Sequence, residues 1–212
     1  MANFPAQAQE PVDQAPAAGA ETSKDNLPDA PMNRTHLGPV PAERLTFSER
    51  FHIYAHSMTD AESVIKPALA AGIDQGTDTP SEWGQGGAGF GRRFGSAYAR
   101  EVISRTIRFG VAAADREDPR YFPSQESGFW TRTKYAVVRT FVARTDTGTQ
   151  MPAFSRLAGA YGAAFISNAW YPQRQADTPH ALERGSTALA TSAGWNVFRE
   201  FWPDIRKKLH HE

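Results

Sequence analysis

Apolar residues from position 46 onward recur at intervals of three and four, and no segment alternates convincingly between apolar and polar residues. The first spacing places apolar side chains on one face of an α-helix, whereas alternation is typical of a half-buried strand. The spacing predicts helices over 49–58, 60–73, 90–115, 129–145, 153–170 and 179–202, with loops at 74–89 and 119–128. We therefore expect an all-α fold, an irregular bundle of five to six helices.

Residues 1–45 have a different composition. They contain seven prolines, one aromatic residue, six acidic residues and three basic residues. Such a segment buries too little apolar surface to offset the entropy lost on ordering. The sequence thus predicts a disordered N-terminal tail over 1–45 and one helical domain over 46–212, which fits a chain of 212 residues.

Charge and cysteine content exclude several classes of function. Basic and acidic side chains balance at 23 each, which argues against a nucleic-acid-binding protein, because such proteins carry a basic surplus. The chain has no cysteine, so disulfides, thiol catalysis and Cys-ligated metals are excluded. No run of 18 apolar residues occurs, so no transmembrane span is predicted.

Glycines inside the predicted helices suggest tight helix packing. Each one costs about 1 kcal/mol relative to alanine in a helix interior, and close approach of two helices would offset that cost. Over 153–170, small residues are spaced four apart, as in Gly159 and Ala163, so that backbones can touch. Charged residues also follow helical spacing, because Glu101, Arg105 and Arg108 fall on one face of the long predicted helix 90–115.

Several stretches resemble a family of uncharacterised proteins of soil bacteria that are usually predicted to be exported. The stretches are 82–86 (EWGQG), 90–94 (FGRRF), 117–122 (EDPRYF), 160–170 (AYGAAFISNAW) and 196–204 (NVFREFWPD), with 27–31 (LPDAP) in the tail. The likeness covers about 45–208. It implies a secreted or cell-envelope location, with a cytoplasmic one as the alternative. It implies no known activity and no catalytic residues.

The sharpest candidate metal site is formed by His52, His56 and Asp60, spaced four apart. On a continuous helix these side chains share one face and could bind Zn²⁺ or a similar divalent ion, leaving one position for water. A metal-bound water could attack a small ester or lactone. The alternative is two surface or half-buried histidines, with Asp60 capping the next helix.

A second candidate is the acidic group Asp115, Glu117 and Asp118, interleaved with two arginines. Three carboxylates at a helix end and its following loop could ligate Ca²⁺ or Mg²⁺, or serve catalysis beside the histidines. The alternative is a helix end held by local Arg–carboxylate pairs. Acids near a helix C-terminus oppose the helix dipole, which makes a purely local role less natural.

Two basic segments suggest binding of an anion or an anionic surface. The glycines of 84–89 are followed by Arg92 and Arg93, which could hold an anionic group at a helix N-terminus. No strand precedes these glycines, so a dinucleotide site is disfavoured. The predicted helix 129–145 contains no acid, stands beside aromatic residues such as Trp130, and carries four basic residues: Arg132, Lys134, Arg139 and Arg144. A basic amphipathic helix with aromatics is typical of a membrane-surface or anionic-partner face, and a solvated basic face is the alternative.

Two hypotheses of different classes follow. The first is a non-enzymatic envelope or secreted protein that binds an anionic membrane surface or partner through an arginine-rich face. The second is a metal-dependent hydrolase of a small ester or lactone, built on the His/His/Asp site. The nearby carboxylates would assist it, with Zn²⁺, Ca²⁺ or Mg²⁺ as the possible cofactor.

Overall fold

The computed structural model describes residues 44–209. Nearly all of the predicted tail, 1–45, lies outside the described residues. The all-α prediction is confirmed: within 44–209 the chain forms six α-helices. They are α1 (Phe47–Thr59), α2 (Ala61–Gly76), α3 (Gly86–Asp115), α4 (Phe129–Phe141), α5 (Phe154–Ser167) and α6 (Thr178–Leu209). Two 3-10 turns, η1 (Ser81–Trp83) and η2 (Gln173–Gln175), and two short strands, β1 (Val142–Arg144) and β2 (Gln150–Pro152), complete the described part.

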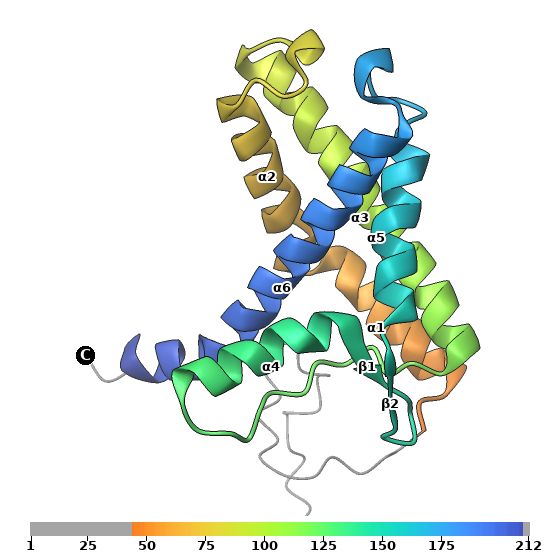
Figure 1. Ribbon diagram of the computed structural model, residues 1–212, viewed down its shortest axis with the longest axis vertical. Coiled ribbons are helices and arrows are strands. Elements are labelled where there is room, and N and C mark those ends of the chain that lie inside the picture. Colours follow the sequence, from red (N-terminus) through yellow and green to blue (C-terminus); the bar gives the residue numbers. More distant parts are fainter. Residues whose placement is uncertain (1–43, 210–212) are drawn as a thin grey trace, which may run out of the picture.

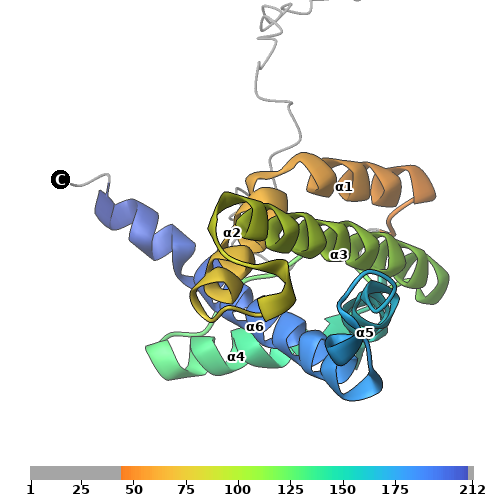
Figure 2. The same ribbon diagram turned by 90° about the horizontal axis from the view of Figure 1, so that it is seen from above.

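Helix α3 is the centre of the fold (Figure 1). It packs against α1, α2 and α5, while α6 packs against α5 and α4. Viewed from above, α1 lies on one side of α3, and α5 and α6 lie on the other (Figure 2). The helices cross at varied angles, which makes the bundle irregular, as the sequence predicts.

Side-chain caps fix the N-terminal ends of the first two helices. Thr46 caps α1: its hydroxyl accepts from the backbone N–H of Glu49, and the Glu49 carboxylate accepts from the backbone N–H of Thr46. This reciprocal pair satisfies two otherwise unbonded donors. Asp60 caps α2 by accepting from the backbone N–H of Ser63 at 2.8 Å. Helix α1 therefore begins two residues before the predicted 49, whereas α2 begins one residue after the predicted 60 and is longer only at its C-terminal end, Gly76.

Three of the helix glycines lie at close contacts, as the small-residue pattern predicts. A Cβ at Gly159 would lie 2.4 Å from Cγ of Arg108 on α3, and one at Gly185 would lie 2.3 Å from Cδ1 of Tyr161 on α5. Gly162 lies against Ile107. The interpretation does not extend to Gly95, Gly110 and Gly194, where a Cβ would meet nothing within 4 Å.

The prediction of one helix over 129–145 was wrong at its C-terminal end. The helix stops at Phe141, and β1 pairs antiparallel with β2, Ala143 opposite Met151. The hairpin closes through Thr145 and Gly148, whose φ is +88°. Residues 117 and 118 also bond to this hairpin, so tertiary contacts favour the strand. Conversely, Pro203 does not end α6, which continues to Leu209.

The interior is built from small and charged residues. Apart from Leu189, every buried hydrophobic residue of the described part is an alanine. Charged side chains are buried among them: Arg50, Glu62, Arg93, Arg105, Glu117, Asp118, Arg139, Asp146 and Glu200. Buried charges need compensating partners. The candidate sites are therefore best judged by which charged groups have partners and which do not.

Candidate functional site

The predicted metal site is not assembled. Helix α1 ends at Thr59, and Asp60 has extended backbone with ψ 159°, so Asp60 leaves the helix face shared by His52 and His56. Its carboxylate caps α2 and lies 3.4 Å from Nη1 of Arg105. His52 is exposed and His56 is half-buried. Over residues 44–209 no group of three or more His, Asp or Glu side chains is placed to hold a metal ion.

The three acidic residues at the C-terminal end of α3 and just after it hold neighbouring segments together at the base of the fold. Oδ1 of Asp115 accepts from the backbone N–H of Glu117, and the buried Asp118 carboxylate binds Arg120 through two nitrogens, at 2.9 and 2.7 Å. Oε2 of Glu117 accepts from the backbone N–H of Ser155 in the first turn of α5. Glu117 thus complements the positive end of α5, which explains an acid placed after a helix C-terminus. These contacts match the alternative of local structural pairing more closely than a catalytic group.

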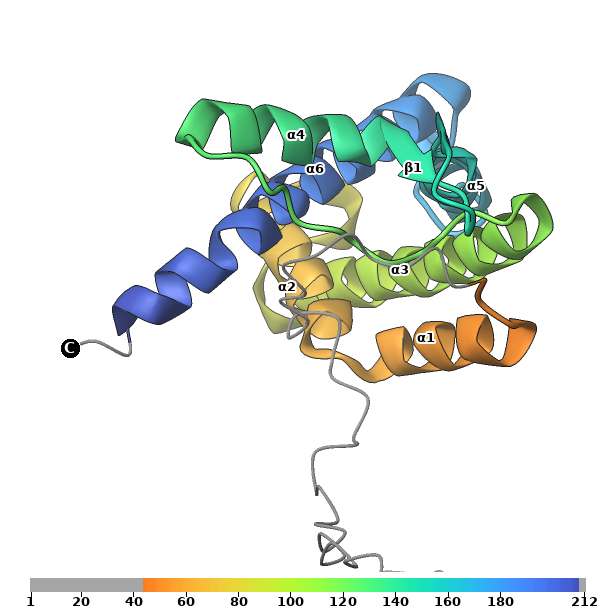
Figure 3. The same ribbon diagram turned by 90° about the horizontal axis from the view of Figure 1, so that it is seen from below.

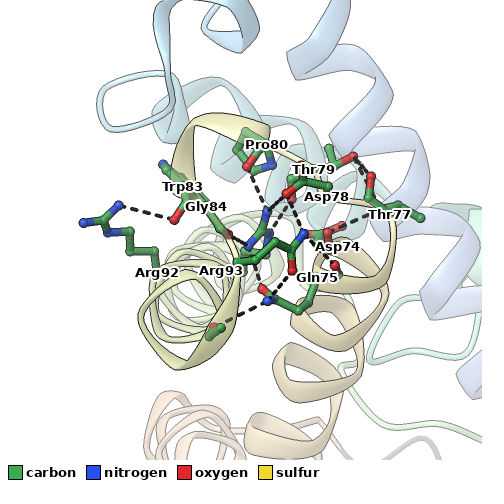
Figure 4. Close-up of polar contacts among 12 residues, drawn as sticks. Asp74, Gln75, Thr77, Asp78, Thr79, Pro80, Trp83, Gly84, Arg92 and Arg93 are labelled. Atoms are coloured by element: carbon green, nitrogen blue, oxygen red, sulfur yellow. Dashed lines mark hydrogen bonds and ion pairs between the residues drawn. The ribbon is translucent and has the colours of Figure 1, made fainter.

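Arg93 is fully buried and holds the glycine-rich loop (Figure 4). Its guanidinium donates to the carbonyls of Thr79, Pro80 and Gly84, to Oε1 of Gln75 and to Oδ1 of Asp78. Five bonds saturate the five donors of an arginine. Arg93 therefore has no donor left for an anionic ligand, while Arg92 is exposed and donates to the carbonyl of Trp83.

The four basic residues of the predicted helix 129–145 do not share one face. Arg132 turns onto α6, where it binds the carboxylates of Glu200 and Asp204 at 3.0 and 2.5 Å. Arg139 is buried, Lys134 is exposed, and Arg144 lies in β1 with its guanidinium 5.8 Å from the ring centre of Phe122. A continuous arginine-rich surface over 92–144 is therefore not what the structure shows.

A buried acid explains the position of Arg132. The Glu200 side chain is fully buried and accepts from the hydroxyl of Tyr121, the backbone N–H of Ser124 and Nε of Arg132. Burial and the Glu200 carboxylate together raise the pKa of Tyr121 well above its ordinary value. This network ties the loop before α4 to α6.

Sequence reasoning missed a group of arginines inside the fold. We call Arg108, Arg139, Arg156 and Arg199 the arginine cluster. They come from α3, α4, α5 and α6 respectively. Arg156 lies within range of the charges of the other three, and its Nη1 donates to the backbone carbonyl of Arg139. The cluster is therefore one electrostatic unit.

Carboxylates next to the cluster are already bonded. Glu62 binds both Lys66 and Arg199, and burial would raise its pKa, but these two cations lower it to about 2. Glu101 binds Arg105 at 2.7 Å, the helical pair that the sequence predicts. Of the cluster, only Arg199 forms an ion pair with a residue of 44–209.

The positions of the other three cluster arginines disfavour their charged forms. Burial lowers the pKa of Arg108 and of Arg139. Burial and then the positive charge of Arg108 lower the pKa of Arg156 to about 10. A lowered arginine pKa means that the surroundings disfavour the charged form. The spacing of Arg105 and Arg108 placed them on one helix face, but nothing in the sequence showed that Arg156 would pack opposite.

A different kind of surface lies on the side of the molecule where α4 begins and α6 ends. The first turn of α4 packs on α6 at Phe201, and beyond this contact the last turns of α6 project away from α4 (Figure 3). We call this surface the α4–α6 end. It carries Phe129, Trp130, Ile205 and Leu209, which are 60%, 79%, 40% and 67% exposed. Four exposed basic residues accompany them: Lys134, Arg206, Lys207 and Lys208. The stacked rings of Phe129 and Phe201, with centres 5.1 Å apart, join the two helices.

No described helix is both long enough and apolar enough to cross a membrane. Comparison of the chain with protein-family models, with curated proteins and with solved structures gives no match. The geometry of the α4–α6 end and of the arginine cluster is therefore the basis for assigning a function.

Proposed function

We propose that this protein is a peripheral membrane-binding protein that docks on an anionic lipid surface through its α4–α6 end. The observation that carries the proposal is Trp130, the most exposed large hydrophobic side chain of the described residues. It stands beside Phe129, which is also mostly exposed. Adjacent exposed aromatic residues on a solvent-facing helix end cost free energy in water and gain it in the lipid headgroup region.

Basic residues supply the second signal that stable membrane attachment needs. Lys134 lies one helical turn after Trp130 on α4, and Lys207 and Lys208 lie in the last turns of α6. Each basic residue near an anionic membrane surface contributes about 1 kcal/mol. Aromatic insertion and a polybasic patch together bind more strongly than either signal alone. A secreted or envelope location, which the family resemblance implies, would bring this end to a bacterial membrane.

The two acids of α6 next to this surface do not cancel the basic patch. Glu200 is fully buried, and Asp204 is bonded to Arg132. The Arg132 guanidinium also lies 4.5 Å from the ring centre of Phe201, so it is committed to the joint between α4 and α6. Arg132 therefore positions the end, whereas the lysines meet the lipid.

Vesicle co-sedimentation tests the proposal. The full chain should bind vesicles of phosphatidylglycerol in phosphatidylcholine, and binding should weaken steeply with salt because charge attraction is screened. It should bind pure phosphatidylcholine far less. Equal binding to both vesicle types, or no binding to either, would overturn the proposal.

Variants locate the surface. The double variant F129S/W130S and the charge reversal K207E/K208E should each reduce binding at least about tenfold, because one of the two signals is removed. The matched control is R174E, since Arg174 is an exposed arginine on η2, remote from the α4–α6 end (Figure 1). An equal loss in R174E would mean that general charge, and not this surface, drives binding.

A further inference from the structure

Three guanidinium groups of the arginine cluster have no carboxylate partner. Arg108, Arg139 and Arg156 form no ion pair with any residue in the described part of the chain, and Arg108 forms no hydrogen bond there either. Arg139 lies 5.8 Å from the ring centre of Tyr135, and Arg156 has one carbonyl partner, that of Arg139. Glu101 and Glu62 act on the charge of Arg108, and Glu117 acts on that of Arg156, but none of these carboxylates forms an ion pair with them. Like charges held together without an anion in direct contact repel each other and lose solvation.

Other buried arginines of this chain show what a structural role requires. Arg93 donates five hydrogen bonds, and Arg105 binds the carboxylates of Glu101 and Asp60. Arg50 donates to the carbonyls of Ala112 and Glu117 and lies 3.6 Å from Asp146. Among the described residues Arg108 has no such direct partner, and only the more distant charges of Glu101 and Glu62 favour its charged form.

The backbone nevertheless makes room for Arg108. Gly159 on α5 lies directly against the Arg108 side chain, and a Cβ there would come within 3.0 Å of both Cγ and Cδ and within 2.8 Å of the carbonyl oxygen of Ser104. Arg108 is half-buried as a residue, and so is Arg156, which lies one helical turn before Gly159 on α5. Both residues therefore keep part of their surface accessible to an incoming anion.

We propose that the arginine cluster is a binding site for a phosphate-bearing anion, held by Arg108 and Arg156 with support from Arg139 and Arg199. A guanidinium presents two parallel N–H donors that match two phosphate oxygens. A doubly or more highly charged phosphate compensates several positive charges at once. Of the adjacent acids, Glu62 and Glu101 are already bonded to cations, and Glu117 accepts from the backbone N–H of Ser155.

The site is separate from the α4–α6 end in both residues and chemistry. The membrane surface offers exposed aromatic and basic residues at a helix tip, whereas the cluster offers partly buried arginines from four helices. The proposal does not depend on membrane binding, and each can fail without the other. The anion could be a soluble phosphate or the phosphomonoester headgroup of a lipid.

Binding of pyrophosphate to the full chain, measured by titration calorimetry and by thermal melts against chloride at matched ionic strength, tests the soluble source. The wild type should bind pyrophosphate and melt at a higher temperature with it, because a ligand of the native state stabilises that state. R108M should bind pyrophosphate at least about tenfold more weakly, because the two parallel N–H donors of the guanidinium are lost. R174M, at the exposed control position, should bind like the wild type.

Without pyrophosphate, R108M should melt no lower than the wild type, because the substitution removes an unpaired and poorly solvated charge. A purely structural arginine would give the opposite result, and a lower melting temperature would count against the proposal. If R108M does not fold, R108K provides the test. Lysine keeps the positive charge but lacks the two parallel N–H donors of the guanidinium, so R108K should bind pyrophosphate several-fold more weakly. Pyrophosphate binding unchanged in R108K would overturn the proposal.

Vesicles distinguish the lipid source. If the anion is a headgroup, the wild type should prefer phosphatidic acid over phosphatidylglycerol, and R108M should lose that preference while still binding both lipids. F129S/W130S should lose vesicle binding and keep the pyrophosphate response. The proposal is wrong if neither pyrophosphate nor phosphatidic acid gives a response that depends on Arg108.

Discussion

At the scale of single residues, Glu200 is the buried acid on which the base of the fold depends. Its carboxylate bonds Tyr121, Ser124 and Arg132, and its side chain has no exposure. A glutamine at this position removes the negative charge that pairs with Arg132. It also places an amide NH₂ group, which can only donate, among side-chain and backbone groups that donate to the carboxylate. We expect E200Q to lower the free energy of unfolding by roughly 3–5 kcal/mol, measured by urea denaturation.

The exposed Glu183 on the same helix provides the control, and E183Q should change stability by no more than about 0.5 kcal/mol. If E200Q and E183Q had equal effects, the buried network would contribute little to stability.

Glu62 gives a pH dependence with a defined direction. Its pKa is lowered from 4.5 to about 2, so the folded state favours the ionised form. The corresponding stability is fully present above pH 4.5 and is lost as the pH falls from there toward 2. At about 1.4 kcal/mol per unit of pKa, it is on the order of 3 kcal/mol. In thermal or urea unfolding, the deficit of E62Q relative to the wild type should narrow on acidification through this window. A deficit that stays constant with pH would contradict it.

Which charged residues are buried could not be predicted from the sequence. Arginines are almost never fully buried unless paired, so Arg93 and Arg139 were assigned to a surface. Their partners are backbone carbonyls and rings supplied by distant segments, and no local spacing reveals these. The sequence predicts only local ion pairs such as that of Glu101 with Arg105, because residues four apart lie about one helical turn from each other.

At the scale of elements, α6 contains two glycines in opposite situations. Gly185 lies against the ring of Tyr161, whereas Gly194 has open space at its Cβ position. We expect G185A to destabilise the fold by about 1–3 kcal/mol through overpacking. G194A should stabilise it by up to about 1 kcal/mol through helix propensity. Urea denaturation of both variants checks the pair, and a stabilised G185A would show that α5 and α6 can separate at little cost.

The helices were predictable, and the hairpin was not. Apolar spacing and the turn signals at Asp74–Gly89 and Asp118–Pro119 located the helices well. Strands of three residues are too short to show alternation, and Val142 continues the helical pattern of α4. The pairing of Glu117 with Thr145 supplies what the local sequence lacks. Tertiary contacts thus explain why the end of one predicted helix forms a strand.

At the scale of the whole molecule, polarity is distributed in an unusual way. Alanines and paired charges fill the interior, while large apolar residues such as Phe47, Leu69 and Ile73 are mostly exposed. Stability therefore rests on tight small-residue packing and on ionic networks more than on burial of large side chains. This arrangement leaves apolar surface available for an external apolar phase, which favours a lipid surface as the partner.

The C-terminal turns of α6 should contribute to binding and not to folding. Residues 205–209 are all exposed, and the Arg132–Asp204 ion pair lies before them. A chain ending at Asp204 keeps this ion pair, so its melting temperature should fall by no more than a few degrees and its helical circular dichroism per residue should be retained. It lacks Arg206, Lys207 and Lys208, and at about 1 kcal/mol for each basic residue its binding to phosphatidylglycerol vesicles should fall roughly a hundredfold.

The same truncated chain separates the two proposed sites. Its response to pyrophosphate should equal that of the full chain, because the arginine cluster ends at Arg199. A larger fall in melting temperature would show that the last turns of α6 belong to the folded core. Unchanged vesicle binding in a fully folded truncated chain would place the membrane contact elsewhere, and the exposed apolar residues of α1 and α2 would then be the next surface to test.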